Sequence, residues 1–155
     1  MKKWLYLLCV IILATLQLTW PGFLTFFNAR PDLLLIFVVS VVLYLDFKAA
    51  LALSVLCGLV KDVFLPVAFG TNTILFTIWC YLIYRLSRQL STESGFLRLA
   101  LILVVVLLNN IISGLQSAYA GPIPVGIFLG SLITSTFYTV ALSPLVFKLT
   151  QRIAE

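Results

Sequence analysis

The sequence predicts an all-α integral membrane protein in which six helices cross the membrane and form one bundle. Hydrophobic residues make up 63% of the 155-residue chain and only 10% are charged, a balance that excludes a water-soluble domain. A span needs about 20 residues to cross about 30 Å of hydrocarbon, so six spans leave only short loops and tails. We therefore expect residues 1–155 to be a single polytopic membrane domain.

The positions of the basic residues predict both an even number of spans and their orientation. With both termini in the cytoplasm, most of the ten Lys and Arg residues lie on the cytoplasmic side, Arg30 lies outside and Lys61 lies within a span. The cytoplasmic residues in this arrangement are Lys2, Lys3, Lys48, Arg85, Arg88, Arg98, Lys148 and Arg152. A five-span alternative would lose the second span. Because the bases form no contiguous run, the charge reports topology, and nucleic acid is not an expected partner.

The first span is expected at residues 4–18. No small-x-small cleavage site follows it, so we interpret it as an uncleaved span and not as a secretory signal. In the segment 19–30, Trp20, Phe23 and Phe27 recur at roughly helical spacing. This pattern fits either an aromatic belt, which we favour, or a helix lying in the headgroup layer.

The second and third spans are predicted at residues 32–45 and 49–65. Pro31 and Asp32 open the second span, because proline fits the first helical turn and aspartate satisfies free amides at a helix N-terminus. A continuous helix through both segments would carry charges near its middle, so the charged residues in 46–48 are expected to form a tight turn at the interface.

The last three spans follow from apolar runs separated by polar or turn-forming segments. The fourth is expected at 71–84, the fifth at 99–119 and the sixth at 125–147. The stretch 85–98 carries three arginines and is predicted to be the longest polar loop, whereas the proline- and glycine-containing stretch 121–124 predicts a short turn.

Small residues recur at intervals of four in the third span and end in a carboxylate. Ala50, Ser54, Gly58 and Asp62 lie along one helix face, which lets another helix approach closely. A charge in hydrocarbon costs roughly 3 kcal/mol, so Asp62 needs a partner. Interhelical hydrogen bonding is the favoured role, with ion coupling and partner docking as alternatives. We expect the adjacent Lys61 to point about 100° away and to reach the outer surface.

Amide side chains near the middle of the fifth span are the expected complement of Asp62. Asn109 and Asn110 either hold the bundle together by hydrogen bonds or line a small-ligand pocket between the third and fifth spans. In the sixth span Gly126 and Gly130 form a GxxxG motif, which indicates only that some helix packs there. The cysteines lack CxxC spacing and are interpreted as small buried thiols; they are Cys9, Cys57 and Cys80.

The composition argues against an enzyme and against a bound cofactor or metal. The chain has no histidine, and its five acidic residues are scattered along it. No pattern indicates a nucleophile paired with a base or a cluster of metal ligands. We therefore expect a protein that acts by binding.

Three short motifs carry a family resemblance. Arg30-Pro31-Asp32 precedes an apolar span, Gly-Leu-Val-Lys-Asp occupies 58–62, and Gly-Thr-Asn occupies 70–72. Together with the length and the six-span layout, they resemble the MreD family, the rod shape-determining membrane proteins of bacteria. The matching residues, to which the resemblance assigns packing and partner contact, are Pro31, Asp32, Gly58, Asp62 and Gly70.

The resemblance implies a non-enzymatic, multi-pass subunit of the cell-elongation machinery in the inner membrane, surrounded by membrane lipid. The family's implied partner is the bitopic protein MreC, and through it cytoplasmic MreB filaments are linked to RodA and its transpeptidase partner, which synthesise wall peptidoglycan. The resemblance also implies a fold similar to that of the S-components of energy-coupling-factor transporters. The alternative function is a transporter subunit that binds a small vitamin-type ligand, and neighbouring genes would distinguish the two.

Overall fold

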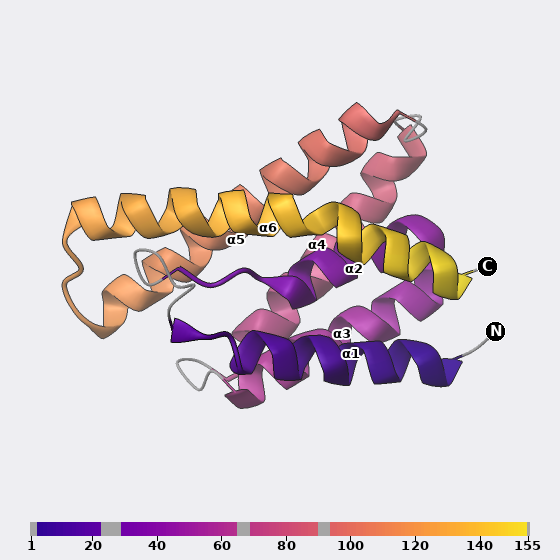
Figure 1. Cartoon of the computed structure of the whole chain (residues 1–155), viewed down its shortest axis with the longest axis horizontal. Helices are drawn as coiled ribbons and strands as arrows, with labels where there is room; N and C mark the ends of the chain where they lie inside the picture. The colour runs from indigo at the N-terminus through magenta and orange to yellow at the C-terminus, as the bar shows by residue number, and fades with distance from the viewer. Residues whose placement is uncertain (1–2, 23–28, 65–68, 90–93, 155) are drawn as a thin grey trace.

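The computed structural model describes residues 3–22, 29–64, 69–89 and 94–154, and these residues form six α-helices and no β-strand (Figure 1). The all-α prediction is confirmed. In chain order the helices are α1 (Lys3–Leu18), α2 (Leu33–Tyr44), α3 (Phe47–Phe64), α4 (Thr71–Gln89), α5 (Gly95–Ala120) and α6 (Val125–Ala154).

Most helix ends fall within a few residues of their predicted positions. The turn predicted at 46–48 separates α2 from α3, with Asp46 and Lys48 exposed. The polar loop predicted at 85–98 is wrong in extent, because α4 continues to Gln89 and α5 begins at Gly95. Arginine, leucine and glutamine are good helix formers, so polarity alone does not end a helix.

One further difference concerns the end of the sixth span, and part of two other predictions lies outside the described residues. The last helix continues to Ala154, past the predicted end at 147. In the aromatic segment 19–30, Trp20 is half-buried, whereas Phe23 and Phe27 lie outside the described residues, as do positions 65 and 66 at the predicted end of the third span.

The core of the molecule is α2. Its residues from Leu33 to Val42 are all buried, and α2 packs against each of the other five helices. Figure 1 shows it near the middle of the bundle. This position follows from its sequence, in which Ser40 is the only polar side chain before Tyr44, because a helix that is apolar on all sides must be covered by protein or lipid.

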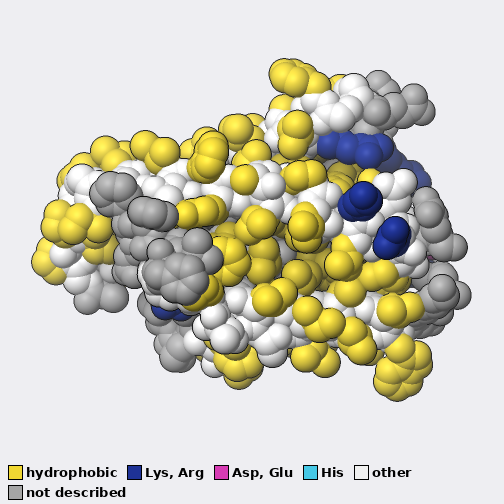
Figure 2. Space-filling model, in the orientation of Figure 1, with side chains coloured by type: hydrophobic (Ala, Val, Ile, Leu, Met, Phe, Trp, Pro, Cys, Tyr) yellow, Lys and Arg dark blue, Asp and Glu magenta, His cyan; other side chains and the backbone are white. Residues whose placement is uncertain are grey.

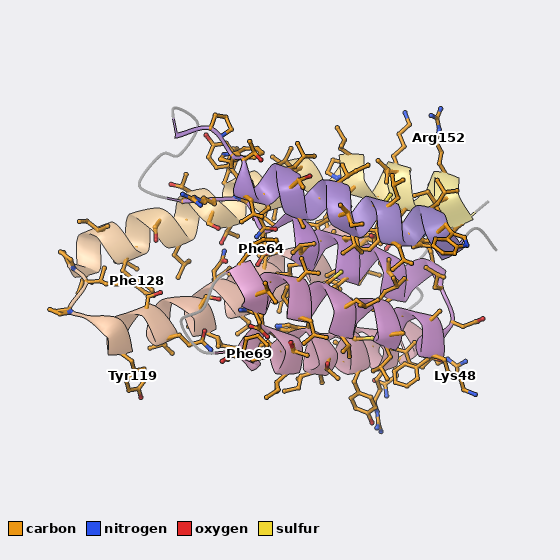
Figure 3. The ribbon with its side chains drawn as sticks, turned by 90° about the horizontal axis from the view of Figure 1, so that it is seen from below. Lys48, Phe64, Phe69, Tyr119, Phe128 and Arg152 are labelled. Atoms are coloured by element: carbon orange, nitrogen blue, oxygen red, sulfur yellow. The ribbon has the colours of Figure 1, made fainter. Side chains whose placement is uncertain are left out.

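The two chain termini lie at the same end of the molecule (Figure 1). Lys48 and Arg152 lie at this end too, whereas Tyr119 and Phe128 lie at the opposite end, near the turn between α5 and α6 (Figure 3). An even number of helices that run back and forth produces this arrangement.

The outer surface is strongly hydrophobic. Apolar side chains cover most of the face in Figure 2, and large apolar residues are exposed on α1, α3, α4, α5 and α6. Among the described residues, the two helices α5 and α6 are long and apolar enough to cross a membrane, and their most apolar stretches are only 28% and 11% buried inside the molecule. The apolar helices α1 and α2 are shorter, so the crossing of all six helices stays a prediction.

Candidate functional site

Asp32 forms the N-cap of α2, as the sequence predicted. Its Oδ1 accepts a hydrogen bond from the backbone N–H of Leu35 at 3.3 Å. Pro31 lies just before the cap and not in the first helical turn, because α2 begins at Leu33. The cap supplies a partner for an amide that would otherwise be free at the helix N-terminus.

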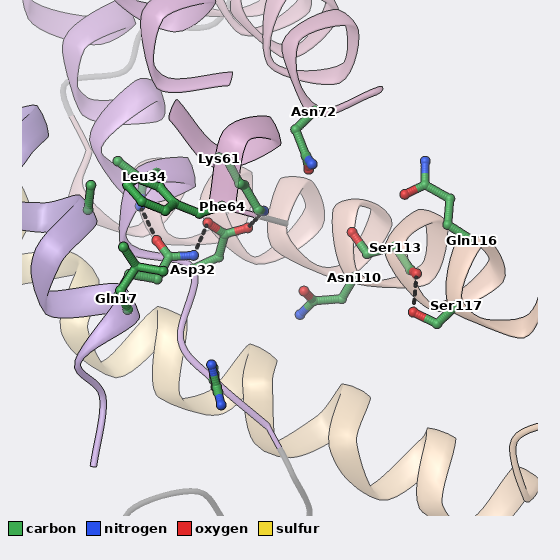
Figure 4. A pocket seen from close by; sticks show the side chains of 13 residues that line it. Gln17, Asp32, Leu34, Lys61, Phe64, Asn72, Asn110, Ser113, Gln116 and Ser117 are labelled. Atoms are coloured by element: carbon green, nitrogen blue, oxygen red, sulfur yellow. Dashed lines mark hydrogen bonds and ion pairs between the residues drawn. The ribbon is translucent and has the colours of Figure 1, made fainter. Parts of the chain in front are cut away.

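Five helices meet at Asp32. Lys61 of α3 forms an ion pair with Oδ2, and Asn109 of α5 donates to the same oxygen at 3.4 Å. Gln17 of α1 donates to Oδ1 at 3.5 Å, and the backbone N–H of Asp32 donates to Thr139 Oγ1 of α6 at 3.3 Å. We call these five residues the Asp32 junction; Figure 4 shows Gln17, Asp32 and Lys61 together.

Lys61 is buried, so the expectation that it reaches the outer surface was wrong. The residue is 8% exposed, and its ammonium group lies over the ring of Phe76 at 5.1 Å from the centroid and pairs with Asp32. The sequence correctly suggested that Lys61 points away from Asp62. It did not show that a carboxylate 29 positions earlier lies in that direction.

Asp62 caps α4 from the neighbouring helix. Its Oδ1 accepts hydrogen bonds from the backbone and side-chain nitrogens of Asn72 at 3.0 and 2.9 Å. Its Oδ2 accepts from the backbone N–H and hydroxyl of Thr73 at 3.0 and 2.6 Å. Gly70, with a φ of 93°, provides the left-handed turn that leads into α4. The expected partner of Asp62 therefore exists, but it belongs to α4 and not to the fifth helix.

The small-residue face of α3 packs against α4. Ala50, Ser54, Gly58 and Asp62 are all buried there. A Cβ at Gly58 would collide with the Cα of Thr73 and lie 2.9 Å from its backbone nitrogen, so the two backbones are in direct contact. This close approach is what the spacing of small residues predicted. It also brings Asp62 within reach of the first turn of α4.

The polar pair in α5 serves two different helices. Asn109 joins the Asp32 junction, and Asn110 donates to Thr136 Oγ1 of α6 at 3.1 Å. Neither bonds to Asp62, which corrects the expected pairing.

The sequence did not indicate that Gln17 and Thr139 belong to the Asp32 junction. Gln17 had a signal, because it is the single amide side chain within the first apolar run.

The first glycine of the GxxxG motif of α6 has no other helix packed against it among the described residues, so the partner of the motif stays a prediction. Gly126 is exposed, and a Cβ there would have no atom within 4 Å among the described residues. The close contact between α5 and α6 lies instead at Gly114, where a Cβ would be 2.8 Å from Cζ of Phe128. The three cysteines are free and buried, as predicted.

A cavity of ≈ 270 Å³ lies beside the Asp32 junction (Figure 4). Asp32 and Lys61 form one part of its wall, and Asn110, Ser113 and Gln116 of α5 form another. Asn72, at the start of α4, also lines it. Within the described residues no group of three His, Cys, Asp or Glu side chains is placed to hold a metal ion.

The family comparison agrees with the motifs that meet at these sites. The family model for the rod shape-determining protein MreD matches residues 1–153 of the 155-residue chain. No curated protein and no solved structure matches the chain. The matched region includes Arg30-Pro31-Asp32, which precedes α2, and Lys61-Asp62, which lies in α3. It extends through all six helices almost to the C-terminus. The chain therefore belongs to the MreD family of rod shape-determining membrane proteins.

Proposed function

We propose that this protein is a non-enzymatic subunit of the bacterial cell-elongation complex in the inner membrane. In this role it binds an MreC-like protein with one membrane span and links MreB filaments to RodA and its transpeptidase partner, directly or indirectly. The observation that carries the proposal is the match of the MreD family model to residues 1–153.

The internal use of the buried charges supports a binding role. Asp32, Lys61 and Asp62 each bond to neighbouring helices, so these charges hold the bundle together. A protein of this kind acts on wall synthesis by holding other membrane proteins in place.

We further propose that six helices cross the membrane with both termini in the cytoplasm. The two termini lie at the same end of the molecule as Lys48 and Arg152 (Figures 1 and 3). This supports the orientation, because basic residues are enriched on the cytoplasmic side of membrane proteins. The exposed apolar side chains of α5 and α6 would then face lipid or a partner helix.

Depletion in a rod-shaped host tests the function. Depleted cells should become round and wide while they continue to make peptidoglycan, because an assembly is lost and no chemical step is removed. The purified protein should carry an MreC-like partner with it from detergent. Depleted cells that stay rod-shaped but fail to take up a vitamin would contradict the proposal and favour the transporter alternative.

One substitution tests where the partner helix lies. We propose the face of α6 that carries Gly126 and Gly130, because Gly126 is open in the described structure. Gly126→Leu should keep the thermal stability of the protein and reduce recovery of the partner. Gly95→Leu is the matched control, since a Cβ at Gly95 also has no atom within 4 Å and Gly95 begins a different helix. Equal recovery with both variants would exclude this face.

A further inference from the structure

Polar and charged residues gather around the cavity, although most of the surface that lines it is apolar. Nine of its thirteen lining residues are polar or charged, whereas 63% of the whole sequence is hydrophobic. Polar groups inside a membrane protein are costly unless they are paired or face a polar ligand or water. The lining therefore indicates a site for a ligand with both polar and apolar parts.

The charges around the cavity leave one positive charge without a counterion. Lys61 is neutralised by Asp32 in the wall. Arg30 also lines the cavity, is exposed, and forms no ion pair within the part of the chain that the structure describes. The lining thus has a net charge of +1, which a single monoanion would balance.

Neutral hydrogen-bonding groups complete the wall. The hydroxyl of Ser113 and the amide of Gln116 make no hydrogen bond among the described residues. Figure 4 shows both on the stretch of α5 that lines the cavity, apart from Asp32 and Lys61 on the other side. Unpaired hydroxyl and amide groups beside one arginine suit a ligand that carries both a phosphate and hydroxyl groups.

The rim of the cavity favours an amphiphilic ligand such as a lipid. Two lining residues, Leu18 and Phe64, are apolar and 43% and 49% exposed, so apolar surface is continuous with the polar interior. An amphiphile would place its head group inside and its acyl chains against such surface.

We propose that this cavity binds the head group of an anionic phospholipid whose phosphodiester carries free hydroxyl groups, as phosphatidylglycerol does. Arg30 pairs with the phosphate, and Ser113 and Gln116 bond to the head-group oxygens. Bound lipid joins the wall formed by α5 to the walls formed by α1, α3 and α4. The site is independent of the proposed role in cell elongation, since no partner protein takes part in it.

The test uses the full chain, purified in detergent and stripped of lipid. Phosphatidylglycerol or phosphatidylcholine with identical acyl chains is added, thermal unfolding is followed, and bound lipid is counted by native mass spectrometry. Phosphatidylglycerol should raise the midpoint of unfolding more than phosphatidylcholine. Its affinity should fall at least tenfold in Arg30→Gln and in Ser113→Val, but change less than twofold in Arg152→Gln, an exposed arginine at the other end of the molecule.

Four results would overturn the proposal. The first is an equal effect of the two lipids, and the second is an equal loss of affinity in Arg152→Gln, which would indicate a general attraction of anions. The third is full stabilisation by soluble glycerol phosphate, which would make the ligand a free phosphate ester. The fourth is that Arg30→Gln and Ser113→Val keep their lipid affinity but lose the MreC-like partner, which would assign the cavity to a protein. Because lipid binding and partner recovery are measured separately, failure of one proposal is distinguishable from failure of the other.

Discussion

The ion pair between Asp32 and Lys61 is buried, with side chains 8% and 9% exposed. Removing a charge from water costs several kcal/mol, and a partner with additional hydrogen bonds offsets this cost. Asp32 has such bonds from Leu35, Gln17 and Asn109. Each charge of the pair therefore depends on the other.

This dependence predicts a strong coupling between the two residues. Lys61→Met should destabilise the protein by about 3–5 kcal/mol, because it leaves the Asp32 carboxylate buried and unpaired. The double variant Asp32→Asn with Lys61→Met should be more stable than the sum of the single effects predicts, by about 1–3 kcal/mol. Thermal or denaturant unfolding in detergent measures this coupling, and Lys48→Met, at an exposed lysine of the same helix, is the control. Strict additivity would contradict a buried pair.

Asp62 differs from Asp32 because its partners are hydrogen-bond donors and not a cation. Asp62→Asn keeps one acceptor oxygen for two of the four donors, so we expect a loss of about 1–3 kcal/mol and retention of most function. Asp62→Leu removes both acceptors and adds bulk beside Gly58, so it should lose both folding and function. Unfolding midpoints and rescue of cell shape measure the two effects. Equal loss in both variants would show that the negative charge itself is required.

At the scale of helices, two glycines make close contacts of different kinds. A Cβ at Gly58 would meet the backbone of Thr73, whereas a Cβ at Gly114 would meet the ring tip of Phe128. Backbone cannot move without shifting α4, but a ring can change its rotamer. Gly58→Ala should therefore lower the midpoint of unfolding clearly more than Gly114→Ala, with Gly126→Ala as an open-site control. The reverse order would mean that α3 and α4 are not in backbone contact.

The helices were predictable from sequence because breaks and caps are local. Asp32 caps α2 through its own first turn, and the charged turn at 46–48 separates two apolar runs. Pairing between helices was not predictable, because the apolar pattern shows which face is buried and not which helix covers it. The carboxylate of Asp62 was assigned to α5 for this reason, although its donors lie in α4 only ten residues further along the chain.

At the scale of the whole molecule, basic residues mark one end and an uncharged turn marks the other. The termini, Lys48 and Arg152 mark one end, and Tyr119 and Phe128 mark the other (Figures 1 and 3). Turns at the first end are charged, whereas the turn between α5 and α6 contains only glycine, proline and apolar residues. Under the positive-inside rule, this asymmetry predicts one orientation of the bundle in the membrane.

That orientation is testable with single cysteines in a variant whose three native cysteines, all buried, are replaced by alanine. Cysteines introduced at Ser94 and Gln151, both exposed, should resist an impermeant thiol reagent added outside intact cells and react once the cells are permeabilised. A cysteine at Pro122, exposed in the turn before α6, should react without permeabilisation. The expectation follows because four helices separate the N-terminus from the turn at Ser94 and five separate it from the turn at Pro122. If the N-terminus is cytoplasmic, labelling at Ser94 from outside would require an odd number of crossings before that turn, and the short helix α2 would then be the one that does not span the membrane.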